Sequence, residues 1–286
     1  MKTKTKGNLL IFLTAFFWSF LGVATKFTST NGIIVTGVTS LCALILIRIF
    51  FIKHKLKLNK ISICSGTILA GVNLTFFMAN KLTTVTNTIV LQYSSPIFVL
   101  IISILFLKYK PAKKQIGILI FCMLGMAVFF SDQFTSGNMT GNILALISGI
   151  LFAVSFILNA MPESDPSTSM IINHFVCFSF ALVYALFSGQ RPVTADIGIM
   201  IITGVFFSGF ASIFYSLGMK MTTALNANMI ALSEVFMAPL WALILFHENL
   251  GKLSLLGILM MISSIILESY LENKLSDSEK TGKPTN

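Results

Sequence analysis

Charged residues are scarce in this sequence. Asp, Glu, Lys and Arg together make up only 10% of its 286 residues, whereas hydrophobic residues make up 55% and the mean hydropathy is +0.88. A soluble domain carries about 25% charged residues. Because so few charged side chains cannot cover a water-facing surface, the composition excludes an ordinary soluble protein and predicts a protein that lies in a membrane.

Signatures of enzyme chemistry are also missing. The four cysteines, Cys42, Cys64, Cys122 and Cys177, lie in apolar stretches without Cys-x-x-Cys spacing, so neither a disulfide framework nor a zinc site is expected. The sequence has no phosphate-binding glycine loop, no His-Glu-x-x-His and no Gly-x-Ser-x-Gly. We therefore expect a protein that is not an enzyme, with no catalytic residue, no metal and no cofactor.

Ten apolar runs are long enough to cross a bilayer. Each approaches the 20 or so residues that a membrane-spanning helix needs, and backbone groups in lipid must be satisfied within the helix itself. The short connections leave no room for a soluble domain. The predicted fold is an all-α integral membrane protein with ten transmembrane helices. The predicted spans are residues 8–27, 32–52, 62–80, 86–107, 114–131, 142–160, 169–188, 197–219, 222–246 and 253–272.

The chain contains an internal repeat. Residues 81–87 (KLTTVTN) return as residues 220–226 (KMTTALN), a shift of 139 residues, and Gly7-Asn-Leu-Leu10 returns as Gly141-Asn-Ile-Leu144. Duplication of this kind is common in transporters. The predicted organisation is a first five-helix repeat at 1–131, a connecting loop at 132–140, a second five-helix repeat at 141–272 and a polar, disordered cytoplasmic tail at 273–286.

Lysine and arginine predict the topology. With the N-terminus inside, the first half has twelve of these residues on the cytoplasmic side against two outside, and the second half has four against two. The net charge of +10 therefore indicates membrane topology and not nucleic-acid binding. Since each repeat holds an odd number of spans, the two repeats are expected to be inverted, with both termini cytoplasmic. The lysine-rich start imitates a signal peptide, but the run after it matches residues 141–160, so we expect a retained helix.

Two segments of the sequence resemble the end of an EamA domain of the drug/metabolite transporter superfamily. Residues 214–257 contain an aromatic-rich helix end, a turn of small residues and threonines, an apolar helix with a central glutamate (Glu234), and a glycine nine residues after a helix-end glutamate (Glu248). Residues 76–117 look like the same segment of a first EamA domain. The resemblance covers almost the whole chain and implies a membrane transporter of small solutes.

The sequence departs from the EamA pattern at several positions. Val235 replaces the proline that follows the mid-helix glutamate, although Pro96 occupies that place in the first half. Tyr109 stands where the first half would carry its helix-end glutamate. These differences leave the expected fold intact, but they weaken any transfer of substrate from a relative.

Glu234 is the sharpest single candidate for function, because it is the only acidic residue that we expect deep inside a span. It lies 12 residues after Thr222, which places it ~18 Å along the helix. A charge at the centre of a span costs roughly 2.5–3.5 kcal/mol on insertion scales. We interpret Glu234 as a proton-coupling group or an anchor for a substrate ammonium. The alternative is a structural carboxyl that is hydrogen-bonded to a neighbouring helix.

Polar side chains in the fourth span predict a central cavity. By the 139-residue shift, Ser95 is the counterpart of Glu234 and Asn87 is the counterpart of Asn226, so both sets are expected near the axis that relates the repeats. Pro96 removes one backbone hydrogen bond and is expected to kink the helix there. Ordinary interhelical hydrogen bonding is the alternative. The predicted substrate- or proton-binding residues are Trp18, Asn87, Gln92, Tyr93, Ser95, Tyr215, Asn226 and Glu234.

We interpret the chain as a secondary active transporter, and as an exporter, of small metabolites, amino acids or drug-like solutes by alternating access. The direction and the substrate class follow from the resemblance alone. The alternatives are a membrane-embedded enzyme or flippase that acts on lipid-linked substrates, and a non-transporting membrane scaffold. The expected partners are a small-molecule substrate, the lipid bilayer of the cytoplasmic membrane and protons as the coupling ion. The chain is expected as a monomer or homodimer. Lys81 and Lys220 are expected to reach lipid head groups.

Overall fold

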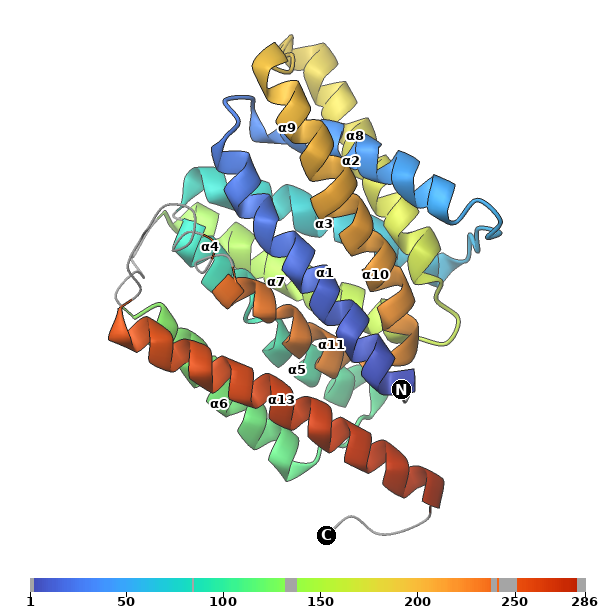
Figure 1. Ribbon diagram of the computed structural model, residues 1–286, viewed down its shortest axis with the longest axis vertical. Helices are drawn as coiled ribbons and strands as arrows, with labels where there is room; N and C mark the ends of the chain where they lie inside the picture. Colours follow the sequence, from blue (N-terminus) through green and yellow to red (C-terminus); the bar gives the residue numbers. More distant parts are fainter. Residues whose placement is uncertain (1–2, 84, 132–137, 238–240, 242–250, 282–286) are drawn as a thin grey trace.

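The computed structural model describes residues 3–83, 85–131, 138–237, 241 and 251–281, and every regular element among them is a helix (Figure 1). The prediction of an all-α protein is thus confirmed. The first half contains α1 (Thr3–Lys26), α2 (Gly32–Phe50), α3 (Lys60–Leu82), α4 (Val85–Gln92), α5 (Ser95–Leu107) and α6 (Lys113–Phe129).

The second half follows the same order. It contains α7 (Met139–Ala160), α8 (Pro166–Ser188), η1 (Thr194–Asp196), α9 (Ile197–Ile202), η2 (Thr203–Phe210), α10 (Ala211–Gly218), η3 (Met219–Met221), α11 (Ala224–Ala231) and α13 (Lys252–Thr281). The elements η1 and η3 are short 3-10 helices, whereas η2 is a π-helix of 8 residues. Together α9, η2, α10 and η3 form one helical run that corresponds to α3 by the 139-residue shift.

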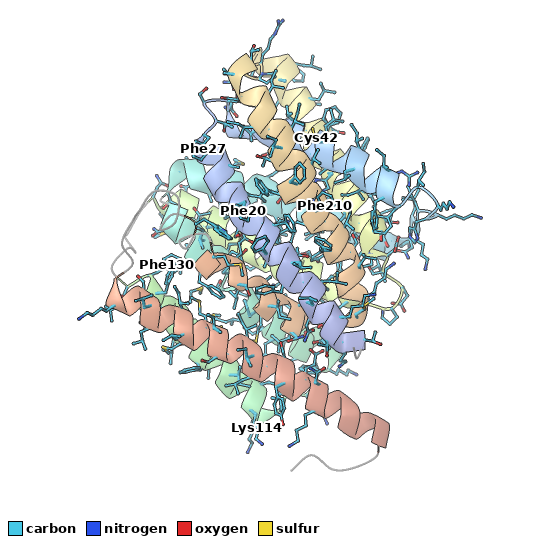
Figure 2. The ribbon with its side chains drawn as sticks, viewed as in Figure 1. Phe20, Phe27, Cys42, Lys114, Phe130 and Phe210 are labelled. Carbon is cyan, nitrogen blue, oxygen red and sulfur yellow. The ribbon has the colours of Figure 1, made fainter. Side chains whose placement is uncertain are left out.

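Six helical stretches among the described residues are long and apolar enough to cross a membrane, and two shorter apolar helices lie at Lys60–Phe76 and Ala224–Met237. The ten crossings therefore stay a prediction, although a helix or part of one lies at each expected span. Figure 2 shows side chains over the outside of the helices, and large apolar residues such as Phe106, Leu186 and Phe187 are more than two-thirds exposed there. An apolar exterior of this kind suits lipid.

Helices of each half pack against helices of the other half. In the first half, α3 lies against α7 and α8 of the second half, while the run α9–η2–α10 lies against α1 and α2 of the first half. The last helices of the two halves, α6 and α13, pack on each other along one side of the molecule (Figure 1). Gly125 and Gly257 allow this approach, because a Cβ on Gly257 would lie 2.6 Å from the carbonyl oxygen of Gly125.

The equivalent segments α4–α5 and α11 cross in opposite directions. Tyr93 contacts Glu234, and Ser95 contacts Asn228. Ser95 comes two residues after Tyr93, whereas Asn228 comes six residues before Glu234. Partners that move forward along one segment and backward along the other define an antiparallel pair, as expected for an inverted repeat. A kink was predicted here from Pro96, and the structure goes further, since α4 ends at Gln92 and α5 starts at Ser95.

The predicted tail is partly wrong. The helix α13 continues past residue 273 to Thr281, whereas the polar sequence led us to expect disorder from residue 273. Leu, Glu and Lys in this stretch are good helix formers, so an established helix extends through them at little cost. Of the predicted connecting loop, residues 132–137 lie outside the described residues, as do residues 282–286 of the predicted tail.

Candidate functional site

The centre of the molecule is a contact between the two repeats. The hydroxyl of Tyr93, at the end of α4, donates a hydrogen bond to a carboxylate oxygen of Glu234. Glu234 follows α11 after a turn at Leu232 and keeps part of its surface exposed, whereas Tyr93 is buried. The helix is interrupted on both segments at this crossing, before Pro96 and at Leu232. Two of the predicted site residues are thus brought into direct contact.

A chain of aromatic rings leads away from Tyr93. The ring of Phe152 in α7 lies edge-on to Tyr93, with centroids 6.1 Å apart, and also packs on Trp18 at 6.2 Å. The Trp18 ring lies 5.9 Å from Tyr215 of α10, and Phe156 lies 5.5 Å from Tyr215. Trp18 and Tyr215 were both predicted as site residues, and the structure connects them to Tyr93 through Phe152.

The chemistry of this centre is that of a carboxylate in an aromatic setting. Among the described residues, the hydrogen bond that Glu234 receives comes from a neutral hydroxyl, and no lysine, arginine or histidine forms an ion pair with it. Burying a carboxylate without a cation is costly unless it binds a proton or a positively charged group. Aromatic faces also attract cations. The arrangement can therefore hold a proton or an organic cation at Glu234.

Two other predicted residues bind neighbouring helices near the centre. The hydroxyl of Ser95 donates to the side-chain oxygen of Asn228 at 2.9 Å, and both residues are buried. The amide of Gln92 donates to the hydroxyl of Ser148 in α7 at 2.9 Å. These contacts match the alternative of ordinary interhelical hydrogen bonding, and they leave the role of Ser95 and Gln92 in any site a prediction.

The predicted residues Asn87 and Asn226 lie away from the centre, in two equivalent clamps between the repeats. The amide nitrogen of Asn87 lies 3.1 Å from the side-chain oxygen of Asn142, and the amide nitrogen of Asn226 lies 2.8 Å from that of Asn8. Asn8 and Asn142 come from the repeated Gly-Asn sequences. The clamps explain both repeated motifs, because the asparagine of the Gly-Asn motif in one repeat binds the asparagine that ends the Lys-x-Thr-Thr-x-x-Asn motif in the other repeat.

Glycine is needed beside each clamp. A Cβ on Gly7 would lie 2.5 Å from the Cβ of Met221, and a Cβ on Gly141 would lie 2.8 Å from the Cβ of Thr83. Such distances are far below ordinary contact, so the first helix of each repeat approaches the end of the third helix of the other, just before its fourth span, only because no side chain intervenes. Sequence analysis singled out the motifs but could not show that they meet.

Sequence analysis missed two buried acidic residues. Glu268 in α13 is 1% exposed and accepts a hydrogen bond from Gln115 of α6 at 2.9 Å. Glu272 is 5% exposed, accepts from the backbone of Thr223 at 3.2 Å and pairs with Lys4 at 3.4 Å. Sequence analysis gave neither residue a role, because both lie near the end of the last predicted span, where α6 covers Glu268.

The expectation for the two repeated lysines also changes. Lys220 pairs with Asp165 at 2.8 Å instead of reaching lipid head groups. Asp165 is buried at the start of α8, where sequence analysis saw only a connecting loop. The side chain of Lys81 lies outside the described residues, and so does Glu248, the expected helix-end glutamate.

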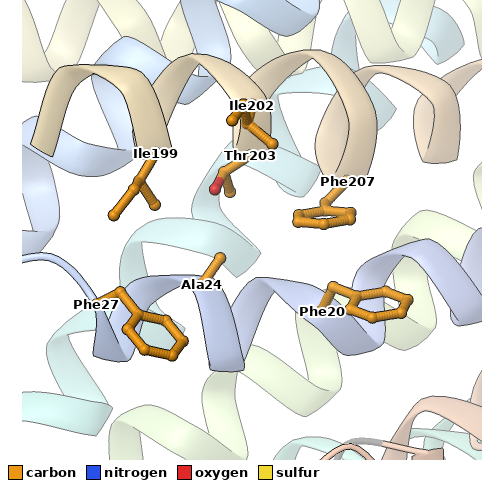
Figure 3. Close-up of a pocket in the computed structure, with 7 residues that line it drawn as sticks. All are labelled: Phe20, Ala24, Phe27, Ile199, Ile202, Thr203 and Phe207. Carbon is orange, nitrogen blue, oxygen red and sulfur yellow. The ribbon is translucent and has the colours of Figure 1, made fainter. Parts of the chain in front are cut away.

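A hollow on the molecule lies apart from these residues. It has a volume of about 260 Å³. Figure 3 shows that it lies between α1 and the run α9–η2. A second hollow of about 370 Å³ lies between α5 and α6. Both are lined almost entirely by apolar side chains, and neither is lined by a predicted site residue. They are hollows in the apolar exterior. The first is lined by Phe20, Ala24, Phe27, Ile199, Ile202, Thr203 and Phe207.

These features define a multi-pass helical membrane protein built from two repeats that meet at a central carboxylate. A model of the EamA-like transporter family matches residues 5–131 and 139–270, one match in each half. The chain therefore belongs to the EamA-like transporter family, and the expected resemblance is confirmed. This family is a transporter family.

The fold is shared with solved structures. Among solved structures, 29 chains match. One of them, described only as a crystal structure of a protein, superposes with a TM-score of 0.80 at 13% sequence identity and covers 95% of this chain and 99% of that chain. At this identity the likeness shows the fold alone. No curated protein matches the chain.

Proposed function

We propose that the protein is a secondary active transporter that exports a small, ammonium-bearing solute across the cytoplasmic membrane by alternating access. The N- and C-termini lie in the cytoplasm in this proposal. The observation that carries it is the Tyr93–Glu234 contact at the antiparallel crossing of the two repeats. Membership of a transporter family supports the general class. The apolar and aromatic surroundings support an organic solute.

Glu234 is the group that couples transport to protons in this proposal. When the site is empty, a proton neutralises the carboxylate and removes the cost of a charge among apolar rings. A substrate ammonium takes the place of that proton and pairs with the ionised form. Tyr93 orients the carboxylate from the opposite repeat. Because proton and substrate compete for one group, inward movement of a proton drives outward movement of the solute.

The test uses purified protein in sealed vesicles and a panel of amino acids, amines and drug-like cations, with and without a pH gradient. Glu234→Gln keeps the size of the side chain and removes its charge. We expect it to lower gradient-driven transport by at least about tenfold, which corresponds to about 1.4 kcal/mol. Folding and membrane insertion should persist, because an amide still accepts the hydrogen bond from Tyr93.

Glu268→Gln is the matched control, since it removes another buried carboxylate that lies outside the central contact. It should leave gradient-driven transport close to that of the wild type. Substrate exchange without a gradient separates the two roles of Glu234: exchange survives in Glu234→Gln if the carboxylate carries only protons and fails if it binds the substrate. Wild-type gradient-driven transport in Glu234→Gln would refute the proposal and leave Glu234 as a structural group.

A further inference from the structure

Two aspartates tie the connections together at opposite ends of the molecule. At one end, Asp165 joins the connection between α7 and α8 to the connection between α2 and α3. At the other end, Asp196 joins the connection between α8 and α9 to the connection between α1 and α2. Since α2 and α8 each run from one of these sites to the other, the two sites lie at opposite ends of the helix bundle.

The Asp165 cluster consists of Asp165, His54, Ser62, Thr168 and Lys220, and it is built on charge. The side chain of Asp165 is 0% exposed, and its carboxylate lies 2.7 Å from the ring nitrogen of His54 and 2.8 Å from the ammonium of Lys220. The hydroxyl of Thr168 donates to the same carboxylate at 2.6 Å. The backbone N–H of Asp165 donates to the hydroxyl of Ser62 in α3 at 2.9 Å.

The Asp196 cluster consists of Asp196, Ser29, Thr30 and Val193, and it is built on neutral donors. One carboxylate oxygen of Asp196 accepts from the backbone N–H groups of Ser29 and Thr30, both at 2.8 Å. The hydroxyl of Thr30 donates to the same oxygen at 2.7 Å, and the backbone N–H of Val193 donates to that hydroxyl at 3.0 Å. No ion pair of Asp196 occurs among the described residues.

The difference between the ends can be traced to one position. Asp165 precedes α8, and by the 134-residue shift that relates Asn8 to Asn142, its counterpart is Asn31 before α2. Both cap the following helix: Asp165 accepts from the backbone of Thr168, and Asn31 accepts from that of Ile33. The capping role needs only an oxygen. The cap of α8 therefore does not require the charge of Asp165, and that charge forms the ion pair with Lys220.

We propose that the Asp165 cluster is a gate: the ion pair of Asp165 with Lys220 and its hydrogen bond with His54 hold this end closed, and breaking them is the step that opens it. The inference rests on the alternating access of the proposed function. His54 belongs to the first repeat, whereas Asp165 and Lys220 belong to the second, so the His54 arm holds the two repeats together. Opening would hydrate three groups that hydration favours once they separate. At the Asp196 end, Asp196 is the only charged side chain of the cluster, so the gain in hydration on opening is smaller.

The test measures opening directly by thiol labelling of purified full-length protein in detergent micelles, where a water-soluble reagent reaches both ends. All four native cysteines are first replaced. One reporter is Ser216→Cys, which lies one turn before Lys220 and is 0% exposed. The other is Val35→Cys, which lies one turn after Asn31 and is 4% exposed. The labelling rate of a buried thiol follows the population of the open state.

Lys220→Gln and His54→Gln each remove one arm of the gate and leave the cap of α8 in place. We expect each to raise the labelling rate at Ser216→Cys by at least about fivefold, the change that about 1 kcal/mol makes in an equilibrium. The rate at Val35→Cys should not rise. Asp196→Asn is the matched control and should not raise the rate at Ser216→Cys.

A smaller rise at Ser216→Cys in both variants would overturn the proposal, and so would an equal rise at both reporters, which would indicate general loosening. Asp165→Asn provides a further variant, because asparagine also caps helices but cannot form the ion pairs. Labelling does not depend on transport. If Glu234→Gln transports like the wild type while Lys220→Gln opens Ser216→Cys, the gate stands and the coupling role of Glu234 fails.

Discussion

The two repeats share a framework but differ where chemistry is expected. Each repeat has a Gly-Asn helix start that clamps onto the fourth span of the other repeat, through Asn8 in one and Asn142 in the other. At the crossing of the fourth spans, by contrast, one repeat has Ser95 and the other has Glu234 at the same position. Tyr93 has Leu232 as its counterpart. The centre therefore carries one carboxylate instead of two.

This comparison separates two kinds of polar residue. Groups that are present twice lie in interhelical hydrogen bonds and fix how the repeats pack. Groups that are present once, such as Glu234 and Asp165, carry a charge that packing alone does not require. A second carboxylate at the centre would repel the first, since like charges in a site of low dielectric cannot both remain ionised. The asymmetry thus allows a single group to titrate.

The largest expected effect comes from making the centre symmetric. Ser95→Glu places a second carboxylate at a position that is 0% exposed and removes the hydrogen bond to Asn228. We expect the free energy of unfolding to fall by at least roughly 2.5–3.5 kcal/mol. Thermal and denaturant unfolding in detergent would measure this. Ser95→Ala is the control and should cost only about 0.6 kcal/mol. A Ser95→Glu protein as stable as the wild type would mean that the two central positions are equivalent.

Much of the framework could be predicted from sequence, because it depends on local patterns. The apolar runs, the duplication, the kink at Pro96 and the contact of Glu234 with the opposite repeat all follow from spacing and composition. The partners of these groups could not be predicted. Asn87 and Asn226 were expected in one central cavity, but each binds the helix start of the opposite repeat. That pairing follows from the packing of helices of one repeat against helices of the other. Such packing is not encoded in the sequence around any one of these residues.

Other features left no trace in the sequence. The π-helix η2 lies in the second repeat, and the equivalent stretch of α3 in the first repeat is a regular α-helix. Both segments are apolar and rich in small residues. Burial of Glu268 depends on α6, which lies about 150 residues earlier in the chain. Asp165 looked like a loop residue because its partners, His54 and Lys220, are distant in sequence. Tertiary contacts decide all three.

The second prediction concerns close packing of equivalent helices. A Cβ on Gly204 in η2 would lie 2.6 Å from the carbonyl oxygen of Thr39, and one on Gly66 in α3 would lie 2.5 Å from that of Ser169. Gly204→Ala and Gly66→Ala should therefore each destabilise by about 1–3 kcal/mol, despite the helix propensity of alanine. Thermal unfolding would measure both. Gly117→Ala is the control, since a Cβ there meets nothing within 4 Å. A cost in only one repeat would show that the π-helix changes how tightly this face packs.

The third prediction tests the charge of Asp165 by its pH dependence. Burial alone would raise the pKa of Asp165, but hydrogen bonds from Lys220, Thr168 and His54 outweigh it and lower the pKa below its ordinary value. A carboxyl whose pKa is lowered by folding contributes stability that is complete above the ordinary pKa of about 3.9 and is lost as the pH falls below it. Between pH 6 and pH 3 the wild type should therefore lose more thermal stability than Asp165→Asn. Parallel melting curves for the two proteins would contradict a charged Asp165 cluster.

The smallest expected effect tests whether the two clamps are equivalent. A double-mutant cycle of Asn8→Ala with Asn226→Ala should give a coupling energy of about 0.6 kcal/mol, typical of a hydrogen bond between membrane helices. A cycle of Asn142→Ala with Asn87→Ala should give a similar value, because both pairs join a helix start to the fourth span of the other repeat. The cycle isolates the pair from the other bonds that each asparagine makes. If only one cycle shows coupling, the two asparagine pairs do not contribute equally to stability. One of the pairs would then have acquired a separate role.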